Sequence, residues 1–153
     1  MYKNWTHSNK AVFNIGYHLI WCTKYRKPML KLEIEERLKF LLLEKAKEMD
    51  ATIEQMEIMP DHVHLFIKCS PVDSPHFIVQ QCKGYTSRLM RKEFSELRTR
   101  VPTLWTRSYY CESVGHISEK TVNETMTNNV SRPLFSLILS IKTKKFFWCA
   151  TVV

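Results

Sequence analysis

Hydrophobic and polar residues alternate early in the chain, which is the pattern of a half-buried strand. In FNIGYHLIWCT, residues 13–23, every second side chain is aromatic or aliphatic up to the tryptophan. Two further runs, ATIEQMEIM (51–59) and HVHLFIKC (62–69), have a similar composition. Only Pro60 and Asp61 separate them, so we predict two antiparallel strands joined by a tight turn.

Two segments have helical periodicity. Residues 33–50 repeat apolar side chains at intervals of three and four, and glutamates fill the first turn, where the helix dipole favours them. A second helix is expected to begin at Ser74, because serine caps helices well and Pro75 suits the first helical position. Its apolar stripe consists of Ile78, Cys82, Tyr85 and Leu89.

The last predicted strand is WTRSYYCES, residues 105–113, which we place in the centre of the sheet. Ser118 then predicts the start of a terminal helix. The order β-α-β-β-α-β plus this helix predicts an α+β, ferredoxin-like fold, with two helices on one face of an antiparallel sheet. We assign residues 1–125 to this domain and 126–153 to a divergent C-terminal tail, either separate or part of the same domain.

Composition indicates one globular domain in a reducing compartment. The chain has 153 residues, of which 44% are hydrophobic and 25% charged, which suits a single domain with a core. Its five cysteines are odd in number and form no CxxC pair, which argues against a disulfide framework. The N-terminus lacks the apolar segment of a signal peptide, and residues 134–141 are too few to cross a bilayer. We therefore expect a cytoplasmic protein without a membrane partner.

The charge balance favours an anionic partner. Lys and Arg outnumber Asp and Glu by 23 to 15, and such an excess promotes binding to nucleic acid through counterion release. Small basic proteins without such a partner are the alternative. Lys83 and Arg88 on the second helix suit either phosphate contact or a solvated surface. A basic turn with an aromatic residue inside it consists of Lys24, Tyr25, Arg26 and Lys27. Such a turn suits phosphate contact combined with base stacking, and a solvated loop is the alternative.

Two histidines stand one residue apart in PDHVHLFIK, residues 60–68. Side chains alternate along a strand, so His62 and His64 are expected on one face, with their Cα atoms roughly 6.5–7 Å apart. Two imidazoles at this spacing can bind one divalent ion, and Asp61 could hold one ring by a hydrogen bond. A strand that merely contains two histidines remains the alternative. The other histidines, including His18, are scattered and are interpreted as structural or incidental.

The strand PDHVHLFI resembles the histidine–hydrophobic–histidine (HUH) motif of the small one-tyrosine transposases of single-strand insertion sequences. The resemblance continues in order through YHLIWCTKYRKPML, KGYTSRLMRKEF and LWTRSYYCESVGHISEKTV, and covers about residues 11–123. It implies a ferredoxin-like homodimer that binds hairpin-bearing single-stranded DNA and a divalent ion, Mg²⁺ or Mn²⁺, on the histidine pair. It also implies DNA transposition, in which a tyrosine attacks a backbone phosphate and the strand is cleaved and rejoined.

The chain departs from this family at the expected nucleophile. The family has a tyrosine on the terminal helix and a metal-binding glutamine four residues later, whereas TVNETMTNN has Thr125 and Asn129 there. A threonine hydroxyl is shorter and far less acidic than a phenol, whose pKa is about 10. Tyr109 and Tyr110 are strand residues, for which one ring in the core and one on the sheet face is expected. We therefore expect weak or absent cleavage; the alternatives are a non-catalytic nucleic-acid-binding regulator, an inactive dimer partner, or a purely structural ion.

Overall fold

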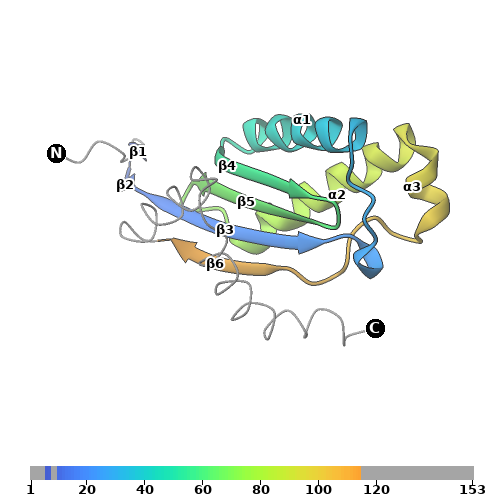
Figure 1. The fold of residues 1–153 in the computed structure, drawn as a ribbon. Helices are drawn as coiled ribbons and strands as arrows, with labels where there is room; N and C mark the ends of the chain where they lie inside the picture. The colour runs from blue at the N-terminus through green and yellow to red at the C-terminus, as the bar shows by residue number, and fades with distance from the viewer. Residues whose placement is uncertain (1–5, 8–9, 115–153) are drawn as a thin grey trace, which may run out of the picture. The chain divides into compact units, whose positions relative to one another are not determined.

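A four-stranded antiparallel sheet forms the centre of the computed structural model, which describes residues 6–7 and 10–114 (Figure 1). Helices α1 (Glu33–Glu48) and α2 (Pro75–Glu93) pack against one face of this sheet. The element order confirms the predicted α+β, ferredoxin-like fold. The strands run in the order β4-β5-β3-β6, with bounds β3 (Ile15–Cys22), β4 (Thr52–Met59), β5 (His62–Cys69) and β6 (Tyr110–Val114).

Alternation along β3 and β5 separates the two faces of the sheet. Leu19, Trp21 and Leu65 are at most 1% exposed and belong to the core that the helices cover. From the helices, Leu38 and Ile78 fill the same core and are fully buried. Each buried side chain of this kind contributes about 1.5–3 kcal/mol. This burial determines which face of each strand turns inward, and the intervening residues therefore point to the opposite face.

Helix α2 begins where the sequence predicts. The Ser74 hydroxyl accepts a hydrogen bond from the Phe77 amide at 3.2 Å, and a proline occupies the first helical position. The buried stripe of α2 differs in part from the prediction, because Tyr85 and Leu89 are only partly buried. The fully buried residues are Ile78, Val79, Cys82, Thr86 and Met90. A short helix that the sequence pattern did not predict, α3 (Ser95–Arg100), follows α2.

The last strand differs from its prediction in extent and in place. It begins at Tyr110, since Trp105 makes only an isolated bridge, to Thr23. The Lys83 ammonium on α2 donates to the carbonyls of residues 107 and 108, both at 3.2 Å, so these two carbonyls have a partner outside the sheet. Within the described residues β6 pairs with β3 alone, so it is an edge strand and the central placement was wrong. The strands buried along most of their length, β3 and β5, take the centre instead.

Some of the sequence predictions fall outside the described residues. These are the terminal helix from Ser118 and the domain boundary at residue 125. At the other end, two very short strands, β1 (Thr6–His7) and β2 (Val12–Phe13), pair with each other. The predicted first strand therefore divides into β2 and β3.

A buried threonine joins α2 to the segment before β6, and its removal is expected to destabilise the domain. Thr86 donates to the Cys82 carbonyl at 2.7 Å and accepts from the Trp105 indole N–H at 3.1 Å. Thr86→Val leaves that indole without its acceptor, so we expect the free energy of unfolding to fall by about 1–3 kcal/mol in urea denaturation. The control is Thr99→Val, which removes an exposed bond to the Glu96 carbonyl and should change stability by less than about 0.5 kcal/mol. Equal losses in both variants would contradict this expectation.

Candidate metal and nucleic-acid site

His62 and His64 lie at the start of β5, on the face of the sheet that α1 and α2 do not cover. Their ring centroids are 4.9 Å apart, and both side chains are half-buried. Val63 and Leu65, which alternate with them, are fully buried on the helix-facing side. Both imidazoles therefore share one face, as the alternation predicts.

Asp61 is hydrogen-bonded on both of its carboxylate oxygens. Its Oδ1 lies 2.5 Å from His62 Nδ1, and its Oδ2 lies 3.0 Å from Arg26 Nε and 2.8 Å from Arg26 Nη2. Burial alone would raise the pKa of this carboxyl, but the hydrogen bonds from His62 and Arg26 outweigh it and lower the pKa below its usual value. These bonds therefore stabilise the folded state at neutral pH, and the stabilisation is lost as pH falls through the lowered pKa.

The ionised carboxylate also determines the tautomer of His62. A carboxylate only accepts hydrogen bonds, so His62 Nδ1 carries the proton. In the neutral ring, Nε2 then keeps the lone pair that a metal ion or a donor group would use. A carboxylate–histidine pair of this kind is the usual support of a metal-binding imidazole.

A third histidine, His18 on β3, lies beside His64, which the sequence interpretation did not foresee. His18 is only 6% exposed, its Nε2 lies 3.4 Å from His64 Nδ1, and the two rings stack with centroids 5.5 Å apart. The Tyr110 ring on β6 continues the row at 6.5 Å from the His18 ring. The strand pairing explains this position: Ile20 lies opposite His64, so even-numbered residues of β3 share the histidine face.

Within residues 6–7 and 10–114, no group of three or more His, Cys, Asp or Glu side chains is arranged to hold a metal ion. The described part of the chain thus offers the imidazoles of His62 and His64 as a pair of ligands. The two other predicted site residues, Thr125 and Asn129, lie outside the described residues. No helix in the described part is long and apolar enough to cross a membrane.

The predicted basic turn lies next to the histidine pair. It forms the short helix η1 (Lys24–Arg26) after β3, and the Thr23 amide donates to the Asp61 carbonyl at 2.9 Å. The Tyr25 side chain is 58% exposed, and the Lys24 ammonium lies 4.9 Å from its ring centroid. The Lys27 ammonium binds the last carbonyl of α3 at 2.9 Å. An exposed aromatic ring with a cation above it is therefore available close to the histidines.

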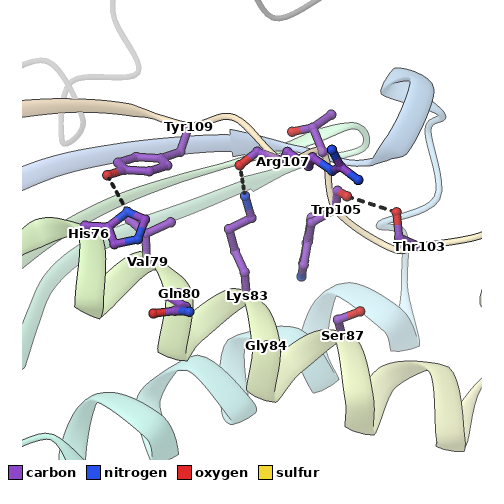
Figure 2. Close-up of a pocket in the computed structure, with 11 residues that line it drawn as sticks. His76, Val79, Gln80, Lys83, Gly84, Ser87, Thr103, Trp105, Arg107 and Tyr109 are labelled. Carbon is purple, nitrogen blue, oxygen red and sulfur yellow. Dashed lines mark hydrogen bonds between the residues drawn. The ribbon is translucent and has the colours of Figure 1, made fainter. Parts of the chain in front are cut away.

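The other two predicted DNA-binding residues are not near the histidines. Lys83 and Arg88 lie on α2, which covers the opposite face of the sheet. Figure 2 shows Lys83 in a hollow of about 350 Å³ between α2 and residues 103–109. At one end of this hollow, His76 Nδ1 lies 3.2 Å from the Tyr109 hydroxyl, and the Tyr109 ring packs against the core. Any DNA contact by Lys83 or Arg88 would thus involve a different surface from the histidine pair.

Fold and site together define a ferredoxin-like α+β protein with a carboxylate-supported histidine pair on one sheet face. The model of the family described as "Transposase IS200 like" matches residues 11–129, and the chain belongs to this family. This confirms the resemblance drawn from the HUH motif. DNA transposition is the activity of this family.

Individual relatives agree with this assignment. The ISDra2 transposase TnpA of Deinococcus radiodurans is 36% identical over 100 residues, which cover 64% of this chain and 71% of that protein. A crystal structure of a transposase-like protein from Deinococcus radiodurans R1 matches with a TM-score of 0.67 and 29% identity, over 82% of this chain and 98% of that one. A REP-associated tyrosine transposase bound to a REP hairpin matches with a TM-score of 0.51 and 10% identity, over 82% and 76%, which supports the fold alone.

Proposed function

We propose that this protein binds hairpin-bearing single-stranded DNA and holds a divalent ion, Mg²⁺ or Mn²⁺, on His62 and His64. The observation that carries the proposal is the Asp61–His62 hydrogen bond beside His64, at the N-terminal end of β5. With Nδ1 of each ring turned to a neighbour, Asp61 for His62 and His18 for His64, Nε2 is the nitrogen that would coordinate the ion. Imidazoles are common ligands of divalent ions, and the carboxylate support fits such a role.

The proposed chemistry is phosphoryl transfer with a defective nucleophile. A bound divalent ion would stabilise the charge that grows on a phosphoryl oxygen. His62 and His64 would orient it, and Asp61 would keep the His62 ring in the required tautomer. Thr125 stands at the position of the family's tyrosine, and Asn129 stands at that of its glutamine. Cleavage and rejoining are therefore weak or absent, because an aliphatic hydroxyl is a poor nucleophile and leaving group compared with a phenol.

Several features support a DNA partner. The net charge of +8 favours polyanions, and the Lys24–Tyr25 pair combines a cation with an exposed ring on which a base could stack. The chain also belongs to a family of transposases, whose substrate is DNA. By analogy with the family we also propose a homodimer. A non-catalytic regulator or an inactive partner in mixed dimers is the second candidate, which the missing tyrosine favours.

A gel assay with a labelled hairpin that has a single-stranded flank, in the presence of Mn²⁺, tests this proposal. We expect binding that weakens steeply with salt, by a slope of about −0.7 per phosphate contact in a log–log plot for single strands. After denaturation in detergent we expect no covalent protein–DNA adduct. A duplex without a hairpin and an unstructured strand of equal length are the controls.

The two parts of the proposal fail in different ways. An adduct that survives detergent would contradict the loss of cleavage and leave the DNA partner supported. Equal affinity for hairpin, duplex and unstructured strand would contradict hairpin recognition. Binding without salt dependence would remove the electrostatic argument altogether.

A further inference from the structure

We propose that Arg26 is a positioning residue for the histidine pair, which fixes Asp61 and, through it, the ring of His62. The inference rests on the proposed function, because it assigns the purpose of this contact to the metal site. It differs from the interpretation of the basic turn as a uniform DNA-binding segment. Arg26 takes a separate role from its neighbours Lys24 and Tyr25.

The contacts of Asp61 carry the inference. Arg26 directs both Nε and Nη2 to Oδ2, at 3.0 and 2.8 Å, while His62 Nδ1 lies 2.5 Å from Oδ1. Each carboxylate oxygen therefore has its own donor group, and Asp61 bridges the guanidinium to the imidazole. With both oxygens held, rotation of the carboxylate away from His62 would break the contacts to Arg26 as well.

The backbone of the turn that carries Arg26 is unusual. Tyr25 and Arg26 have φ values of 60° and 51°, a region that residues other than glycine enter rarely and at a cost. Hydrogen bonds hold the turn there: the Arg26 amide donates to the Thr23 carbonyl at 3.0 Å. The Thr23 hydroxyl lies 2.8 Å from the Lys27 carbonyl and 3.1 Å from the Asp61 carbonyl. The strained turn is thus attached to the same residue that the Arg26 side chain binds.

Elsewhere in the described structure, the chain offers a matched control. Arg37 on α1 forms a similar pair with Glu93 on α2, with Nε and Nη2 both at 2.7 Å from carboxylate oxygens. Both residues belong to the helical layer, and the partner is not attached to a histidine. Arg37→Ala therefore removes an arginine–carboxylate pair of the same type without touching His62.

The first measurement is Mn²⁺ affinity by calorimetry, without DNA, for the wild type, Arg26→Ala, Arg26→Lys and Arg37→Ala. Loss of an outer partner of a metal ligand weakens binding by about 10–100-fold, and Arg26 acts through one more bond, so we expect roughly tenfold for Arg26→Ala. A lysine cannot place two nitrogens on Oδ2, so Arg26→Lys should recover only part of this loss. Arg37→Ala should bind Mn²⁺ like the wild type. In an Asp61→Ala background, Arg26→Ala should cause no further loss.

The second measurement needs no metal. The ¹⁵N chemical shifts of the His62 ring, recorded in metal-free protein, report which nitrogen carries the proton. We expect a protonated Nδ1 in the wild type and in Arg37→Ala, and a mixture of tautomers in Arg26→Ala. Thermal unfolding confirms that each variant is folded, and Arg26→Lys provides a second variant if alanine impairs folding.

The outcomes separate this inference from the proposed function. If the wild type binds no Mn²⁺, the proposed metal site fails, and the ring shifts alone decide whether Arg26 positions His62. Unchanged ring shifts in Arg26→Ala overturn the inference. The inference is also overturned if Arg26→Ala loses hairpin affinity but keeps wild-type Mn²⁺ affinity and ring shifts. A residue that contacts DNA alone would behave in this way.

Discussion

Replacing His62 and His64 together by alanine is expected to abolish measurable Mn²⁺ binding while the domain stays folded. The two rings lie side by side on β5, and the residues that build the core alternate with them on the other face. Loss of both ligands should cost more than the roughly 10–100-fold that loss of an outer partner costs. Calorimetric titration with Mn²⁺ measures the effect directly.

The control for this experiment is His76→Ala. His76 is an exposed histidine on α2, on the helical side of the sheet, and its partner is the Tyr109 hydroxyl. Its removal should leave Mn²⁺ affinity unchanged. If the double variant instead lowers the melting temperature markedly and leaves hairpin affinity untouched, the ion has a structural role and its proposed part in phosphoryl transfer is wrong.

Leu65→Ala is expected to reduce the free energy of unfolding by about 2–5 kcal/mol, through the lost burial and the cavity that remains. Leu65 is fully buried in a central strand, with Leu19 and Met56 as its cross-strand neighbours. Domains of this size are usually stable by about 5–15 kcal/mol, so this loss is a large fraction of the total. Urea denaturation measures it.

Val72→Ala is the matched control for the core substitution. Val72 is 90% exposed in the loop between β5 and α2, so its truncation should change stability by less than about 0.5 kcal/mol. Leu65→Ala with a similarly small effect would mean that β5 does not pack as described. Since His64 is the residue before Leu65, such a result would also undermine the geometry of the histidine pair.

The local elements of this fold could be predicted because burial leaves a periodic trace in the sequence. The Ser74 cap of α2 and the shared face of His62 and His64 follow from short-range spacing, and both occur in the structure. The extent of β6 could not be predicted in this way. The segment before Tyr110 instead makes contacts with a residue distant in sequence, since Lys83 donates to two of its carbonyls.

The shared face of the two histidines in the candidate site was predictable, and their surroundings were not. The order of hydrophobic and polar residues, through the burial that it requires, determined by itself the ferredoxin-like plan and the shared face of the two histidines. The family followed from the resemblance of the HUH motif and its flanking segments. Only the tertiary structure placed His18 beside His64 and directed Arg26 to Asp61, 35 positions away. The physical reason is that side-chain contacts between strands and turns depend on pairing register and on the backbone path of turns, and neither leaves a periodic pattern in the sequence.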